Sequence, residues 1–182
     1  METNDLIAPI LIIIGGILTL LSVLPIISDF IPLLTFSGGG ATAYITFWGT
    51  VTKIAGTTST DTGKPSGWTA LGLSPIIMFL IFAILGIIAI IIAINAFYKF
   101  IPTDKVAGMP FMGLIGIIVG IIDLLLLLLI FLGDSSNLAK TGFSPAQTGY
   151  SIGLGYWILV ISMILILIGA IVNFVIKPKT TS

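Results

Sequence analysis

The chain has 182 residues, of which 57% are hydrophobic and only 8% are charged, and its mean hydropathy is +1.26. A soluble protein of this length needs far more charge to cover its surface, so the composition excludes a soluble domain and indicates an integral membrane protein. The basic and acidic residues number seven each and cancel, which argues against nucleic acid as a partner.

Several residue types that carry chemistry are missing from the sequence. It contains no cysteine and no histidine, and all of its basic residues are lysines. The usual ligands of haem, copper, zinc and iron–sulfur clusters are therefore absent, and so is the usual general base. No nucleophile–base pair and no glycine-rich phosphate loop is found. We expect a chain that is not itself an enzyme and that binds no cofactor and no metal.

Four apolar segments are each long enough to cross a bilayer, at roughly 22 to 25 residues. They cover residues 6–27, 75–98, 110–132 and 152–176. The second segment is introduced by Ser74 and Pro75, a helix N-cap followed by proline at the first helical position. The pattern predicts an all-α integral membrane protein, a four-transmembrane-helix bundle that forms a single domain over residues 1–182.

The orientation of this bundle is predicted from the placement of the lysines. Four spans put both termini on the same side of the membrane. Lysines close to helix ends lie on the side of the termini and of the short middle loop, at Lys99, Lys105, Lys177 and Lys179. The other lysines are spread over two longer segments, residues 28–73 and 133–151. Because basic residues near helix ends are retained in the cytoplasm, we expect cytoplasmic termini and two external loops.

The first external loop is predicted to contain β structure. From Ala41 to Ala55 threonine, aromatic and β-branched residues dominate, and the even positions from Thr42 to Thr52 form one hydroxyl-rich face of an expected strand. A turn-rich stretch follows, and residues 68–73 are expected to return as a second strand. The residues expected to make external-loop contacts are Tyr44, Phe47, Trp48 and Trp68.

Small residues recur along one face of each predicted span. Lipid gives helices no hydrophobic reason to associate, so close packing depends on such residues. The glycines expected to pack helices are Gly15, Gly86, Gly113, Gly116, Gly120 and Gly169. Two uses remain open, namely packing of the chain's own four helices and docking onto another membrane subunit or a second copy.

Asp123 is the one ionisable residue well inside a predicted span. Its spacing from Gly116 and Gly120 places it on the glycine face, and counting residues along each helix brings Thr19 and Ser162 to nearly the same depth. An ionised, unpaired carboxylate there would cost several kcal/mol, and no span carries a lysine to neutralise it. We therefore expect a neutral carboxyl group that donates to a hydroxyl or carbonyl in an Asp123–Thr19–Ser162 cluster.

Three functions are compatible with these features. The leading one is a non-catalytic membrane protein, cellular or viral, that acts as a structural, adhesive or assembly subunit through its external loops and small-residue faces. Its partners would be the lipid bilayer and other membrane subunits or copies of itself. The second is a cofactor-free accessory subunit of a larger respiratory or oxidase complex. The third is a small proton or ion channel or transporter that uses Asp123.

Overall fold

The computed structural model describes residues 3–23, 34–38, 41–46, 49–54, 57–61, 75–98, 105–106, 109–140 and 149–175. The helices in this part of the chain are α1 (Thr3–Val23), α3 (Pro75–Tyr98), α4 (Phe111–Lys140) and α5 (Leu154–Val175). All four are built mainly from isoleucine, leucine and valine. Residues that bury no polar group and satisfy their backbone within the helix suit a bilayer, where no water is present to pair with peptide groups.

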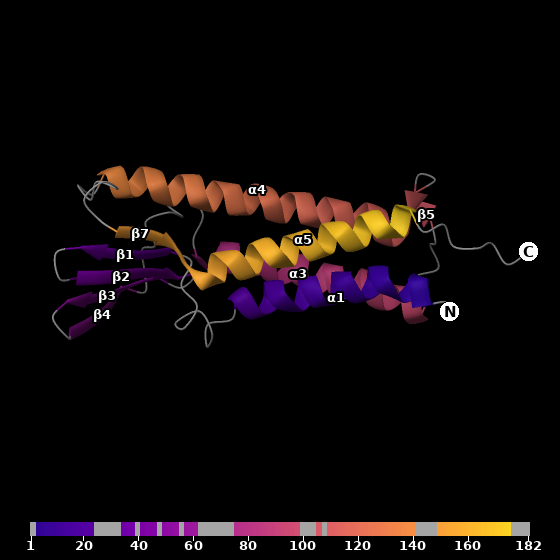
Figure 1. Ribbon diagram of the computed structural model, residues 1–182, viewed down its shortest axis with the longest axis horizontal. Coiled ribbons are helices and arrows are strands. Elements are labelled where there is room, and N and C mark those ends of the chain that lie inside the picture. Colours follow the sequence, from indigo (N-terminus) through magenta and orange to yellow (C-terminus); the bar gives the residue numbers. More distant parts are fainter. Residues whose placement is uncertain are drawn as a thin grey trace, which may run out of the picture.

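The four helices form a bundle in which each helix packs against two neighbours. Helix α1 packs against α3 and α5, and α4 packs against the same two helices from the other side. Figure 1 shows neighbouring helices running antiparallel, with the beginning of α1 and the end of α5 at the end of the bundle opposite the five-stranded sheet. We call these two ends the terminal end and the sheet end.

Three helices contain stretches that are long and apolar enough to cross a membrane, at Leu6–Val23, Phe111–Leu129 and Leu154–Val175. In α3 the corresponding stretch among the described side chains is Leu80–Asn95, which is shorter. Large apolar side chains point outward at alternating steps of three and four residues, as at Ile7, Ile10, Ile14, Ile17 and Leu21 of α1. Such continuous outward-facing apolar stripes are typical of helices that contact lipid. These features indicate an integral membrane protein.

A five-stranded antiparallel sheet lies at one end of the bundle (Figure 1). Its strands are β1 (Leu34–Gly38), β2 (Ala41–Thr46), β3 (Gly49–Ile54), β4 (Thr57–Asp61) and β7 (Gly149–Ile152). Their order in the sheet is β4-β3-β2-β1-β7. Four of the strands come from the segment between α1 and α3, and β7 comes from the segment between α4 and α5. The two segments expected to form separate loops therefore share one sheet.

The single strand expected over Ala41–Ala55 is two strands, because β2 pairs with β3 in an antiparallel hairpin. Paired residues lie on the same face of a sheet. Since Tyr44 pairs with Val51 and Ala43 with Thr52, the even positions of β2 share a face with the odd positions of β3. The expected face of even positions from Thr42 to Thr52 is therefore wrong. Alternation along the sequence predicts an extended backbone. It does not reveal a chain reversal, after which odd rather than even positions lie on the same face.

The register assigns two different faces to the sheet. One face combines threonine and serine positions from four strands, which are Thr35 and Ser37, Thr42 and Thr46, Thr58 and Thr60, and Ser151, together with Tyr44 of β2 and with Val51 and Lys53 of β3. The opposite face has its apolar positions where β7, β1 and β2 adjoin, at Leu34, Phe36, Ala43, Ile45, Tyr150 and Ile152. The sheet is therefore amphipathic, and we call the first of these its hydroxyl face.

Helix α4 differs from its expected extent. It continues past Leu132 to Lys140, through a polar stretch that was expected to belong to a loop. Hydropathy marks where a chain leaves the apolar layer, whereas a helix ends only where its backbone hydrogen bonding ends. At the terminal end, α3 and α4 are joined by a short hairpin of β5 (Lys105–Val106) and β6 (Met109–Pro110). The expected end of the first span at Ile27 and the expected strand over 68–73 lie outside the described residues.

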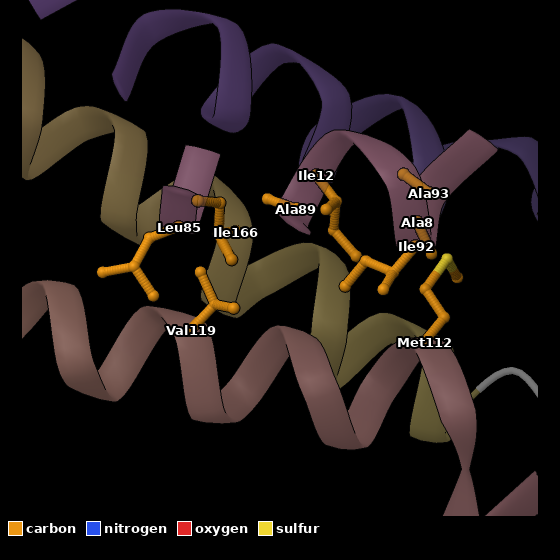
Figure 2. Packing of buried hydrophobic residues seen from close by; sticks show 9 residues of the cluster. All are labelled: Ala8, Ile12, Leu85, Ala89, Ile92, Ala93, Met112, Val119 and Ile166. Carbon is orange, nitrogen blue, oxygen red and sulfur yellow. The ribbon is translucent and has the colours of Figure 1, made fainter. Parts of the chain in front are cut away.

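A cluster of buried apolar side chains joins all four helices (Figure 2). Leu85 of α3, Val119 of α4 and Ile166 of α5 meet at one level, and Ile92 and Met112 meet closer to the terminal end. The cluster consists of Ala8, Ile12, Leu85, Ala89, Ile92, Ala93, Met112, Val119 and Ile166. It forms an apolar core that extends from the middle of the bundle toward the terminal end.

The pairing of β1 with β7 can be tested with a disulfide, because the chain has no cysteine of its own. Thr35 lies directly opposite Ser151, and opposed Cα atoms in antiparallel strands are close enough for an S–S bond. The double variant Thr35→Cys/Ser151→Cys is predicted to form an intramolecular disulfide under mild oxidation, detected as a mobility shift after proteolysis between the two positions. The control pair Thr35→Cys/Tyr150→Cys puts the thiols on opposite faces. Equal cross-linking of both pairs would contradict the register.

Candidate functional site

Glycines bring the backbone of α1 into contact with α5 and α3. A Cβ atom added at Gly15 would lie 2.8 Å from the carbonyl oxygen of Ser162, and one added at Gly169 would lie 2.8 Å from the carbonyl oxygen of Ala8. The same applies between α1 and α3, where a Cβ at Gly16 would lie 2.8 Å from the carbonyl oxygen of Gly86. Distances below 3 Å leave no room for a side chain, so α1 touches α5 and α3 backbone to backbone.

The three predicted packing glycines of α4 contact α5. A Cβ atom at Gly113 would lie 2.8 Å from the ring of Phe174, and one at Gly116 would lie 2.9 Å from the Cβ of Ala170. Gly120 faces Leu167. Together with Gly15, Gly86 and Gly169, all six predicted glycines therefore lie in seams between helices of the same chain. Gly16 is not among the predicted glycines, although it stands next to Gly15 on the face turned toward α3.

A buried hydroxyl pair joins α1 to α5 beside Gly15. Thr19 and Ser162 are each 1% exposed, and their hydroxyl groups are hydrogen-bonded to each other. The Oγ of Ser162 donates to the carbonyl oxygen of Gly15 at 2.7 Å, and the Oγ1 of Thr19 lies 3.2 Å from the same oxygen. The close approach at Gly15 is what brings its carbonyl within reach of a side chain on the neighbouring helix. The structure thus brings together two of the three residues of the expected cluster.

Asp123 lies at the level of this hydroxyl pair. Gly120 faces Leu167 across the antiparallel α4–α5 seam, so one turn farther along α4 reaches the level of Ser162 on α5. Asp123 is 3% exposed and stands on the buried stripe of α4 between Val119 and Leu127. Neither of its carboxyl oxygens has a hydrogen-bond partner among the described residues. Within the described part of the chain, the expected hydrogen bond from Asp123 to a hydroxyl or carbonyl is therefore not formed.

The expected external-loop residues are placed only in part. Tyr44 lies on the central strand β2, on the hydroxyl face of the sheet. Phe47, Trp48 and Trp68 lie outside the described residues. Strand β7 is not among the predicted strands. It is a segment of four residues just before α5, and an alternation over so few residues is too short to predict a strand.

At the terminal end, a further buried polar atom belongs to Asn173 of α5. Its Oδ1 has no hydrogen-bond partner among the described residues. It lies close to the seam with α4, because a Cβ at Gly113 would be 3.1 Å from it. The apolar cluster separates this amide from Asp123.

No protein-family model matches this chain, and no curated protein sequence matches it either. Within the described residues, no group of three or more aspartate, glutamate, cysteine or histidine side chains could hold a metal ion. The candidate site is therefore defined by its own geometry, and we call Asp123, Thr19, Ser162 and the Gly15 carbonyl the polar layer.

The bond across α1 and α5 predicts different costs for two serine substitutions. Ser162→Ala leaves the Gly15 carbonyl without its closer donor and should lower the free energy of unfolding by about 0.6 to 2 kcal/mol. Ser22→Ala removes a hydroxyl that bonds at 2.7 Å to Leu18 of its own helix, so it should cost much less. Thermal unfolding in detergent measures both. Equal losses would show that the interhelical bond adds no stability.

Proposed function

We propose that the chain is a non-catalytic membrane protein with four membrane-crossing helices, and that it acts as a structural, adhesive or assembly subunit whose partner contacts are made by the sheet. Helix α3 is counted as a span because its 24 residues, at about 1.5 Å of rise each, match the thickness of a bilayer core. The partner contacted through the sheet is another membrane subunit or a second copy of the chain.

One observation carries this proposal: the glycine-bearing helix faces pack against other helices of the same chain. Gly15, Gly16, Gly116 and Gly169 each face a neighbouring helix at distances that leave no room for a side chain. A Cβ atom at Gly86 would lie 3.0 Å from the carbonyl oxygen of Gly16, which is a tight contact. The outward faces of the helices carry isoleucine and leucine at regular spacing. Lipid satisfies such faces without any specific partner. Specific recognition is therefore better assigned to the part of the molecule that extends beyond the helices.

The sheet supports this role through its composition and its register. Its hydroxyl face presents threonine and serine positions from the four strands β1, β2, β4 and β7, and β3 adds the charged Lys53. Hydroxyl groups act both as donors and as acceptors, which suits contact with another polar surface or sheet. The sheet also ties both inter-helix segments together through β1 and β7, so the contact surface is held on a rigid scaffold.

The proposed orientation places this sheet outside the cytoplasm. Helix α1 begins and α5 ends at the terminal end, opposite the sheet (Figure 1). The short connection between α3 and α4 is on that same side and carries Lys99 and Lys105 near helix ends. The lysine pattern predicts that this side is cytoplasmic.

The proposal predicts that a charge on the hydroxyl face disrupts assembly. Thr42→Glu should shift the native mass of the gently solubilised protein toward that of a monomer, because the carboxylate must be desolvated at the contact. Thr52→Glu is the matched control, since its register partner Ala43 places it on the opposite face. Ile87→Ala, at a position 47% exposed on α3, is the control for partner contacts made by the lipid-facing surface of the helices.

Two results would contradict this account. Loss of assembly with Ile87→Ala but not with Thr42→Glu would move the contact to the lipid-facing helices. A monomeric wild-type protein, with no co-purifying chain and no ability to link vesicles, would remove the assembly and adhesive roles. For the orientation, a Ser59→Cys variant, on the face opposite the proposed contact because Ser59 pairs with Thr52, should react with a membrane-impermeant maleimide on intact cells. Protection of that cysteine would contradict an external sheet.

A further inference from the structure

The polar layer holds more hydrogen-bond acceptors than donors. Each hydroxyl has one hydrogen to donate. The hydrogen of Ser162 is directed to the Gly15 carbonyl, and the hydrogen of Thr19 is used within the same group, either on that carbonyl or on Ser162. No hydroxyl hydrogen of the pair remains for Asp123. The unused hydrogen-bonding capacity of the layer consists of lone pairs on the two hydroxyls and on both carboxyl oxygens of Asp123.

A layer made of acceptors is complementary to a positive charge. Hard cations prefer carboxylate, hydroxyl and carbonyl oxygens, and a proton on the carboxyl group would supply the missing donor. A carboxylate that is 3% exposed and has no hydrogen-bond partner among the described residues is costly in its ionised form, so a bound cation would stabilise it. From these contacts we propose that the polar layer binds one small monovalent cation, H⁺ or Na⁺, on Asp123.

The surrounding helices supply no competing charge. Residues 6–23 of α1 and 77–97 of α3 contain no ionisable side chain. On α5 the ionisable residue is Tyr156, which precedes Ser162 by nearly two turns. On α4, Asp134 and Lys140 lie beyond the apolar stretch that ends at Leu129. The cation would therefore be neutralised by Asp123 alone.

The shorter path to the polar layer runs from the sheet end. Toward the terminal end, Val119 and Ile166 lie one helical turn from Asp123 and Ser162 and belong to the apolar cluster (Figure 2). Toward the sheet end, Ser22 is a buried polar side chain, and Leu127 and Leu159 are buried apolar ones. The distance along α4 is also shorter in that direction, with six residues to Leu129, or about 9 Å at helical rise. We therefore place exchange on the sheet side, and the layer is a binding site rather than a conducting path.

Cation binding to the folded bundle is tested by thermal unfolding of the purified protein in detergent at constant ionic strength. Replacing choline by Na⁺ in alkaline buffer, or lowering the pH from about 9 to about 5, should raise the wild-type midpoint by about 5 °C. The sign follows because a folded state that binds a cation gains stability as that cation becomes more abundant. Asp123→Asn should abolish the response. Asp134→Asn, the same change on the same helix beyond the apolar stretch, should retain it.

The two cations are distinguished by two readings. A Na⁺-dependent rise that choline and K⁺ do not reproduce identifies the ligand as Na⁺. A pH-dependent rise without a Na⁺ response, together with an infrared carbonyl band of a protonated carboxyl group that disappears in Asp123→Asn, identifies it as H⁺. A wild-type midpoint that responds to neither cation would overturn the proposal. So would an equal response in wild type and Asp123→Asn.

Discussion

The rest of the structure depends on the backbone contact between α1 and α5. Gly15 faces the carbonyl of Ser162, and Gly169 faces the carbonyl of Ala8, so the two helices touch at two points seven residues apart on each. In a bilayer the hydrophobic effect does not drive helices together, and van der Waals contact has to supply the association. One glycine on each helix provides that contact, and the two contact points lie about two helical turns apart. The other seams are built outward from this pair, through Gly16 to α3 and through Ala170 to α4.

This contact also determines the chemistry of the bundle. Because α5 lies so close to α1, the hydroxyl of Ser162 reaches the Gly15 carbonyl and the hydroxyl of Thr19. The pair uses its hydrogens on these bonds, and Asp123 on α4 faces the bundle interior without a donor among the described residues. A packing requirement in one seam thus leaves a buried acid unsatisfied in the next. The acid is the site of the proposed cation binding, whereas the sheet is the proposed contact surface for other molecules.

Much of this arrangement follows from local sequence patterns, and the remainder depends on long-range pairing. Glycine spacing places Gly113, Gly116 and Gly120 in a common seam, because residues three and four apart share a helix face. Helix rise alone brings Thr19 and Ser162 to one depth. The hydrogen bond expected from Asp123 is absent among the described residues. Helix rise predicts the depth of each residue in the bundle, but it does not predict which hydroxyl hydrogens are already donated to another acceptor. The strand β7 and the parity change between β2 and β3 depend on pairing between distant residues, which alternation along the chain does not encode.

The central claim, that α1 and α5 touch through their backbones, is tested most directly by thermal unfolding of Gly169→Ala in detergent. Alanine is the better helix former by about 1 kcal/mol, so helix propensity alone predicts a stabilised protein. The contact with Ala8 predicts the opposite, a loss of about 1 to 3 kcal/mol, because the added methyl group forces the helices apart. Ile168→Ala, at a neighbouring position 45% exposed, serves as the control. An unchanged or higher midpoint for Gly169→Ala would contradict the account.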